Sequence, residues 1–204
     1  LAEKSLFTWL KETPHKAVSN HQAHNLLCTI DGVSYVTSGT ICKRVDFGLR
    51  DTIYKPEKDY FAVENVNGFE KRVKNVYKSL VKIIDGAKAN SKKEEAFYFF
   101  VNLPKAEAVG NFLKNGESNA ISDEITVRRR SEGRATGELV IQNGKSEYEL
   151  ANLCELAMDS KTDKLTKFRA CPTERSDDNV YLALFICEQT GAEGYCVPLR
   201  PENY

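Results

Sequence analysis

The chain has 204 residues, of which 41% are hydrophobic and 28% are charged. This length and composition are typical of a globular protein that buries a core without a metal or a disulfide framework. No run approaches the roughly 18 consecutive apolar residues of a membrane-spanning helix, so no membrane span is predicted. The 29 Lys and Arg residues balance the 29 Asp and Glu residues. Net charge therefore gives no sign of a polyanionic partner, although a neutral protein can still carry one basic face.

The first 64 residues predict a short helix followed by β structure. Residues 2–12 have one apolar side, and Pro14 ends the helix. Residues 26–45 predict a three-stranded meander whose two-residue turns are residues 31–32 and 38–39, both containing glycine. These turns would place Tyr35 opposite Cys28 on one neighbouring strand and opposite Cys42 on the other. A polar loop over residues 48–58 and a short strand over residues 60–64 follow.

The centre of the predicted fold is a helix and a strand. Apolar residues recur with helical spacing after Asn65, namely Phe69, Val73, Val76, Tyr77, Leu80, Val81 and Ile84. The run Ala96–Val101 is apolar without interruption, which is typical of a central strand covered on both faces. We therefore expect the helix and this strand to form the core.

The remaining residues alternate between strand and helix patterns. A short helix is expected around Val109 after Pro104, and a third helix over residues 146–158, where Ser146 and Glu149 have capping-box spacing. Strands are expected over residues 124–130, 137–142, 165–171, 179–187 and 194–199, and the strand over 179–187 reads as interior.

Together these elements predict an α+β or α/β protein. We expect a single domain over residues 1–204, in which residues 1–58 form the N-terminal helix and meander and residues 59–204 form the α/β core. Its mixed sheet would have about six to eight strands. Three helices would pack on this sheet, those that contain Phe69, Val109 and Leu150.

Basic residues gather in two places. Residues 61–93 carry eight basic and three acidic side chains, and residues 128–134 hold four arginines. Because several Lys and Arg side chains on one face can neutralise successive phosphates, both clusters are candidates for nucleic-acid binding. The competing interpretation is a solvated helix face opposite an apolar one. The predicted contact residues are Lys71, Arg72, Lys74, Lys78, Lys82, Arg128, Arg129, Arg130 and Arg134.

The histidines and cysteines do not form a metal motif. His21, His24 and Cys28 would align on a helix, but the segment after residue 26 reads as a strand and the spacing is not a zinc signature. We expect no metal and no cofactor. Of the six cysteines, Cys187 and Cys196 are the pair that a hairpin would set opposite each other. Because the chain can fold without bridges, a reduced intracellular protein is favoured.

The sequence favours binding over catalysis. No phosphate-binding loop, dinucleotide fingerprint or nucleophile turn is present. The leading hypothesis is a non-catalytic nucleic-acid-binding protein that uses the two basic clusters. One alternative is a secreted or virion-surface recognition domain, stabilised by disulfides, that binds a protein partner. The other is a metal-dependent nuclease that would use Asp123, Glu124, Glu138 and Lys145.

Overall fold

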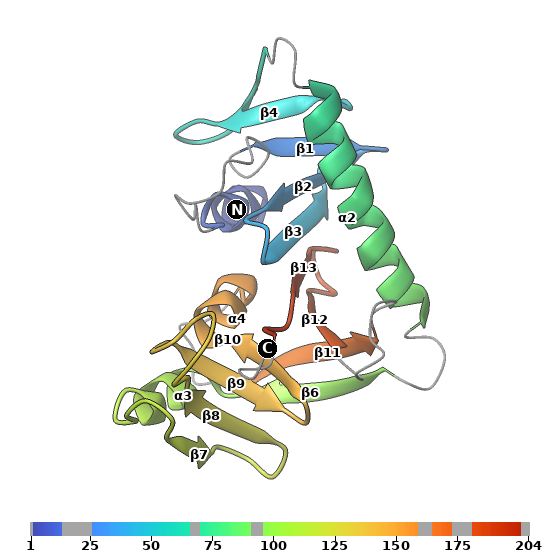
Figure 1. The fold of residues 1–204 in the computed structure, drawn as a ribbon. Coiled ribbons are helices and arrows are strands. Elements are labelled where there is room, and N and C mark those ends of the chain that lie inside the picture. Colours follow the sequence, from blue (N-terminus) through green and yellow to red (C-terminus); the bar gives the residue numbers. More distant parts are fainter. Residues whose placement is uncertain are drawn as a thin grey trace. The chain divides into compact units, whose positions relative to one another are not determined.

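The computed structural model describes residues 2–13, 26–65, 70–90, 96–158, 165–172 and 181–200. These residues form four helices and thirteen strands, which belong to two antiparallel sheets of nine and four strands (Figure 1). The α+β class is confirmed. The predicted single mixed sheet of six to eight strands is wrong, because there are two antiparallel sheets and residues 53–56, 118–120 and 146–149 also form strands. The three helices expected on the sheet are too few as a total, because the helix predicted over residues 2–12 is the fourth.

The chain divides into two compact units. The first unit consists of Leu1–Gly86 and Ile186–Tyr195, and the second consists of Ala87–Phe185 and Cys196–Tyr204. The boundary between the units falls within the long second helix. The single domain over residues 1–204 stays a prediction, and the two units are described separately below.

The first unit contains an antiparallel sheet with strands in the order β5-β4-β1-β2-β3-β13. Its helices are α1 (Ala2–Lys11) and α2 (Glu70–Asn90), the last turn of which belongs to the second unit. Its strands are β1 (Leu27–Ile30), β2 (Val33–Thr37), β3 (Ile41–Asp46), β4 (Ile53–Pro56), β5 (Phe61–Val63) and β13 (Glu193–Cys196).

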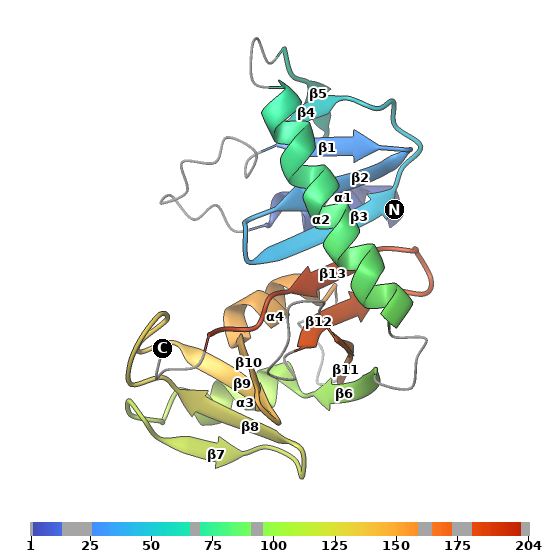
Figure 2. The same cartoon turned by 45° about the vertical axis from the view of Figure 1, so that its right-hand side comes forward.

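Helices α1 and α2 lie on opposite faces of the first-unit sheet (Figure 2). Successive residues of a strand point to opposite faces, and β3 shows this directly. Lys43 is buried on the α1 side, where its Nζ donates to the backbone carbonyl of Trp9 and lies 5.1 Å from the Trp9 ring centroid. Arg44, the next residue, pairs with Asp85 of α2 at 2.9 Å. Lys43 therefore contacts α1 and Arg44 contacts α2, on opposite faces of the sheet.

Of the two turns predicted for the meander, the first is confirmed and the second is wrong by one residue. Asp31 (φ 51°) and Gly32 (φ 78°) form the predicted turn, and Cys28 pairs with Tyr35 as expected. The second turn is displaced by one residue, because Gly39 (φ 90°) takes the first central position that a type II′ turn reserves for glycine. As a result Tyr35 pairs with Arg44, and its predicted pairing with Cys42 is wrong.

The buried face of α2 is the predicted one. Val73, Tyr77 and Ile84 are buried, whereas Phe69 lies outside the described residues. The Tyr77 hydroxyl donates to the carbonyl of Leu26 at 2.6 Å, so this large side chain is buried with its polar atom bonded. Burial raises the pKa of Tyr77 well above its ordinary value, and the phenol remains protonated.

The second unit contains two groups of antiparallel strands and two helices. One group has the order β12-β11-β6 and the other is the four-stranded sheet β10-β9-β8-β7. The helices are α3 (Leu103–Gly110) and α4 (Leu150–Leu156). The strands are β6 (Phe97–Val101), β7 (Ser118–Ala120), β8 (Ile125–Arg129), β9 (Leu139–Asn143), β10 (Ser146–Glu149), β11 (Thr166–Pro172) and β12 (Tyr181–Ile186).

Helix α3 packs closely on the four-stranded sheet. The side chain of Asn102 accepts a hydrogen bond from the backbone N–H of Lys105 at 2.9 Å, which caps the first turn. At the other end a Cβ on Gly110 would lie 2.6 Å from a methyl carbon of Leu139. Any larger residue at position 110 would therefore have to displace the Leu139 side chain.

The third predicted helix begins four residues late. Ser146–Glu149 forms β10, which pairs with β9 across the Gly144–Lys145 turn, and Glu149 makes no side-chain cap. The capping-box prediction at Ser146 and Glu149 is therefore wrong. The turn and the pairing of Tyr148 with Ile141 hold these residues in a hairpin, and the helix starts only at Leu150.

Strand β6 is the largest difference from the sequence-based expectation. It was predicted as a central strand, but it lies at the end of the strand order and pairs only with β11 among the described strands. Phe99 and Val101 are buried, whereas Phe97, Tyr98 and Phe100 are between 41% and 51% exposed. The apolar run gives no indication of this, because an aromatic strand can be stable at an edge when one of its faces is buried.

Candidate nucleic-acid interface

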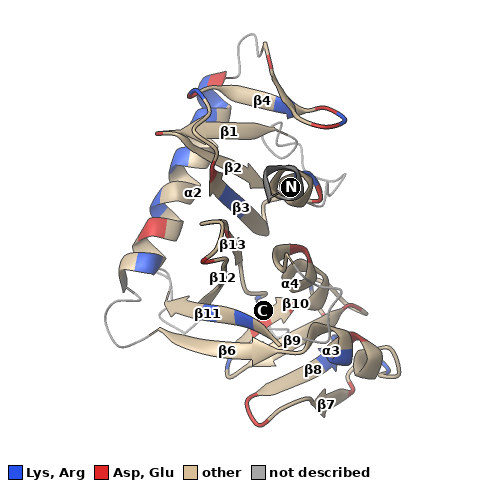
Figure 3. Cartoon of the chain, turned by 180° about the vertical axis from the view of Figure 1, so that it is seen from behind, with Lys and Arg blue, Asp and Glu red and all other residues tan. Residues whose placement is uncertain are grey.

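Three lysines of α2 lie in a row along its exposed side. Lys71, Lys78 and Lys82 are seven and four residues apart, and at 3.6 residues per turn this spacing places them on one side of the helix. That side is opposite the buried face of Val73 and Ile84. All three lysines are exposed, and none makes an ion pair with a described residue. Figure 3 shows that basic positions recur along α2. We call these residues the lysine row.

Two further predicted residues of α2 flank the lysine row. Arg72 is exposed about 100° around the helix from Lys71. Lys74 is half-buried and pairs with Glu70 one turn earlier at 2.6 Å. The hydrogen bond that the Lys74 ammonium donates to Glu70 raises the pKa of Lys74. The positive charge of Lys74 is therefore already balanced, whereas Arg72 adds to the charge of the exposed side.

The arginines of the second cluster are held by a shared acid. Arg128 and Arg130 project to the same side, as predicted, and each pairs with one carboxylate oxygen of Glu147 on β10. The Nε of Arg130 lies 3.0 Å from Glu147, and the residue is only 1% exposed. It also donates to the carbonyls of Arg134, at 2.6 Å, and Arg200. Arg130 thus joins β10, the loop after β8 and the segment after β13.

Arg129 points to the other side and is bound to the backbone. Its guanidinium donates to the carbonyls of Leu113 at 2.6 Å, Gly137 at 2.7 Å and Gly110 at 3.1 Å. Two of these carbonyls belong to α3 and the turn after it, so Arg129 fastens this region to β8. Arg134 differs from its neighbours, because its side chain is exposed on the loop that follows.

The nine predicted contact residues therefore fall into two groups. Exposed side chains are found at Lys71, Arg72, Lys78, Lys82 and Arg134. Side chains already paired within the protein are found at Lys74, Arg128, Arg129 and Arg130. The sequence shows the charge of each residue, but the nearby carboxylates and carbonyls come from segments far along the chain.

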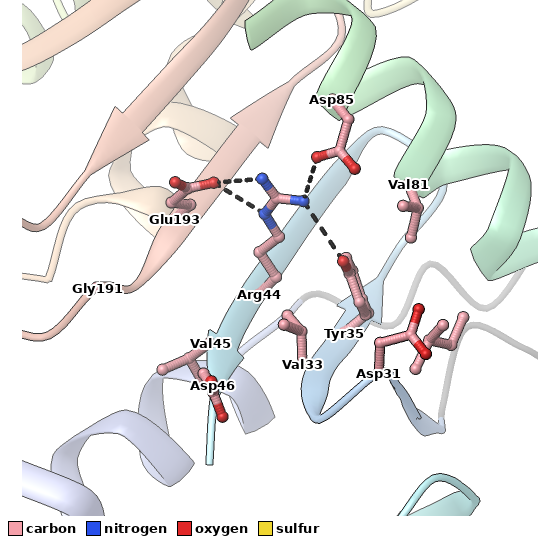
Figure 4. Close-up of a pocket in the computed structure, with 11 residues that line it drawn as sticks. Asp31, Val33, Tyr35, Arg44, Val45, Asp46, Val81, Asp85, Gly191 and Glu193 are labelled. Atoms are coloured by element: carbon pink, nitrogen blue, oxygen red, sulfur yellow. Dashed lines mark hydrogen bonds and ion pairs between the residues drawn. The ribbon is translucent and has the colours of Figure 1, made fainter. Parts of the chain in front are cut away.

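A pocket of about 370 Å³ lies in the first unit around Arg44 (Figure 4). The guanidinium pairs with Glu193 of β13 at 2.7 Å and with Asp85 of α2 at 2.9 Å, and it donates to the Tyr35 hydroxyl at 3.4 Å. Burial lowers the pKa of Arg44, but the charge of Glu193 and the hydrogen bonds to both carboxylates raise it above its ordinary value overall. Arg44 is thus a permanent cation that joins β3 to α2 and β13.

The pocket has more acidic than basic side chains. Besides Asp85 and Glu193, its lining includes Asp31 and Asp46. Within the described ranges, however, no three His, Cys, Asp or Glu residues are placed to hold a metal ion. Two of the four carboxylates are bonded to Arg44. We therefore interpret the ion pairs around Arg44 as contacts that stabilise the first unit. No pattern in the sequence predicts this pocket.

The nuclease hypothesis required four side chains of the second unit to converge. In the pairing of β8 with β9, Leu139 lies opposite Arg129 and Asn143 lies opposite Ile125. Glu138 therefore lies at one end of this strand pair. Asp123, Glu124 and Lys145 lie at the other end, at least six residues or about 20 Å from Glu138 along the strand. The structure does not bring this set together.

The thiols and histidines offer little for catalysis in the described structure. All six cysteines are free thiols. Burial raises the pKa of Cys28 and of Cys154 to about 11, and it also raises the pKa of Cys42, so these thiols are protonated at neutral pH. His15, His21 and His24 lie outside the described residues.

Sequence reasoning missed one surface with functional features. Tyr98 and Phe100 of β6 are about half exposed, and Lys167 of β11 places its ammonium 3.9 Å from the Tyr98 ring centroid. The alternating period of a strand puts positions 98 and 100 on one face, but only the tertiary structure shows that this face is exposed.

No protein-family model matches this sequence, and no curated protein matches it in a sequence comparison. None of the described helices is long and apolar enough to cross a bilayer. The functional proposal therefore depends on the residues of this chain alone.

Proposed function

We propose that this protein is a non-catalytic nucleic-acid-binding protein that contacts phosphates through the lysine row of α2. The observation that supports this function is the row itself. Lys71, Lys78 and Lys82 present three exposed ammonium groups on one side of a single helix, without an ion pair to any residue in the described ranges. Exposed cations held in line by a rigid element are suited to neutralising successive phosphates.

The spacing of the lysine row fits an extended phosphate backbone. At a rise of 1.5 Å per residue, Lys71 and Lys78 lie about 10 Å apart along the helix axis, and Lys78 and Lys82 lie about 6 Å apart. Flexible lysine stems adjust these spacings by several ångströms. Three phosphate contacts would release about two to three counterions, which predicts a slope of about −2 to −3 in log K against log salt.

The arginine cluster contributes less to this proposal than the sequence suggested. Binding a phosphate with Arg129 or Arg130 would break hydrogen bonds to backbone carbonyls, which costs free energy. Arg72 beside the lysine row and Arg134 on its loop are exposed and remain proposed phosphate contacts. The proposed interface is therefore centred on α2.

A charge-reversal experiment tests the function. The triple variant Lys71→Glu, Lys78→Glu, Lys82→Glu should bind a fluorescent oligonucleotide at least about tenfold more weakly than the wild type at low salt, with a flatter salt dependence. Fluorescence anisotropy over a salt series measures both quantities. Thermal unfolding should change little, because the three side chains are exposed.

The matched control reverses three exposed lysines elsewhere, Lys58, Lys114 and Lys145, and so gives the same net charge. This control should keep most of the affinity and the full salt slope. Equal loss in both triple variants would mean that only net charge matters, which contradicts an interface on α2. Absence of wild-type binding at the lowest salt would refute the nucleic-acid function.

A further inference from the structure

The outer face of β6 and β11 in the second unit combines exposed rings with cations. Tyr98 and Phe100 lie two residues apart on β6 and so share one face. The strand register places Arg169 opposite Tyr98 and Lys167 opposite Phe100. The position of the Lys167 ammonium over the Tyr98 ring confirms that these side chains are on the same side. We call this set the aromatic face.

The other side of β6 fixes the aromatic face in place. Phe99 is buried and stacks on Phe168 of β11, with a distance of 5.5 Å between ring centroids. It also stacks on Tyr148 of β10 at 6.0 Å. The alternate residues of this short strand are thus anchored in a packed aromatic layer. The exposed rings are therefore held by the backbone and need little ordering when a ligand binds.

Exposure on this face increases toward the sheet edge. Leu184 of β12, which lies opposite Arg169, is 3% exposed. Arg169 is half-buried, and Tyr98 and Phe100 are 49% and 51% exposed. On β12, two strands from the edge strand β6, this face is thus buried. The accessible part is a narrow strip of two rings beside the ammonium of Lys167.

We propose that the aromatic face binds the unpaired bases of a single-stranded nucleic acid. The two rings, about 7 Å apart along the strand, offer their faces for stacking by neighbouring bases. Lys167 supplies the charge for the adjoining phosphate. Moving its ammonium from the Tyr98 ring to a phosphate exchanges an exposed cation–π contact for a stronger ionic one.

The chemistry of this face favours a single strand over a duplex. In a duplex the base faces are covered by neighbouring base pairs, so rings on a flat sheet surface cannot reach them. A purely apolar protein partner would leave the ammonium of Lys167 without a partner. This inference rests on the proposed function for its class of ligand, but it concerns a different surface from the lysine row.

The experiment compares oligo(dT) of about 12 nucleotides with a duplex of the same length, using fluorescence anisotropy. Replacing Phe100 by alanine should weaken oligo(dT) binding by about ten- to a hundredfold and change duplex binding little. Phe100→Tyr, which keeps an aromatic ring, should retain affinity. Phe100→Leu keeps apolar area without a ring and should lose affinity as alanine does. Phe112→Ala removes an aromatic that is 88% exposed on a different surface and serves as the control.

Each result has a definite meaning. If Phe100→Leu binds oligo(dT) as well as the wild type, or if the alanine variant weakens both probes equally, the stacking proposal is wrong. A wild-type dimer that Phe100→Ala dissociates, seen by sedimentation, would identify a second copy of the chain as the occupant and also overturn it. If the α2 triple variant loses binding to both probes while the Phe100 variants bind normally, the stacking proposal is wrong and the proposed function is supported. Sensitivity to Phe100 alone would overturn the α2 interface instead.

Discussion

The two basic segments of this protein both carry positive charge, but their side chains have opposite environments. On α2, Lys71, Lys78 and Lys82 are exposed and make no ion pair with a described residue. At the end of β8, Arg129 donates to three backbone carbonyls, and Arg130 is buried against Glu147. The comparison teaches that the density of basic residues along a sequence does not reveal how much charge is available to a ligand.

The difference follows from the neighbours of each element. Strand β8 is paired on both sides, with β7 and β9, and α3 lies against it. Its side chains therefore meet backbone carbonyls and the carboxylate of Glu147. Among the described residues of the first unit, no element of this kind neighbours the exposed side of α2, so its lysines remain in water. A lysine is strongly hydrated, whereas the planar guanidinium of arginine can bond several carbonyls at once.

The largest expected effect is on the buried arginine. Arg130→Met removes the guanidinium, leaves Glu147 with only Arg128 and leaves two backbone carbonyls without donors. We expect a loss of about 3 kcal/mol of unfolding free energy, measured by urea denaturation. The same change at exposed Arg72 should cost less than about 0.5 kcal/mol. Equal effects at the two positions would contradict the contrast between the segments.

A conservative change at Arg129 should have an intermediate effect. Lysine keeps the positive charge but has no planar fork, so Arg129→Lys can satisfy at most part of the three carbonyls. We expect a loss of about 1 to 2 kcal/mol in the same denaturation experiment. Arg72→Lys is the matched control and should be neutral. A neutral Arg129→Lys would mean that charge alone, and not the pattern of hydrogen bonds, matters at this position.

The smallest expected effect is on the paired lysine of α2. Lys74→Gln breaks the ion pair with Glu70, and a pair at this spacing on a helix surface contributes about 0.3 to 0.5 kcal/mol. Lys78→Gln breaks no described pair and should leave stability unchanged. Moderate salt should reduce the small difference between the two variants, because surface ion pairs are screened. A salt-independent difference would point to packing of the Lys74 stem instead.

Local patterns in the sequence account for much of the secondary structure. The 3.6-residue period from Val73 to Ile84 places the buried face of α2 correctly. The Asp31–Gly32 turn sets the pairing of β1 with β2. These predictions are correct because backbone sterics and the burial of apolar side chains act over short stretches of the chain.

The patterns fail where two local signals compete. Residues 146–149 have helix-capping spacing, yet the preceding Gly144–Lys145 turn places them in β10. At residues 38–40 a shift of one residue in the turn moves the partner of Tyr35 by two residues, from Cys42 to Arg44. That shift also determines which side chain lies beside Tyr35 in the Arg44 pocket.

The sequence by itself determined the α+β class, the helix of the lysine row and the segments that become most of the strands. Only the tertiary structure decided which charged and aromatic side chains are accessible. The runs at residues 97–101 and 181–186 are equally apolar, yet β6 exposes Tyr98 and Phe100 while β12 is buried on both faces at its centre. The physical reason is that exposure depends on strand order and on distant partners such as Glu147, which the local period of a sequence does not contain.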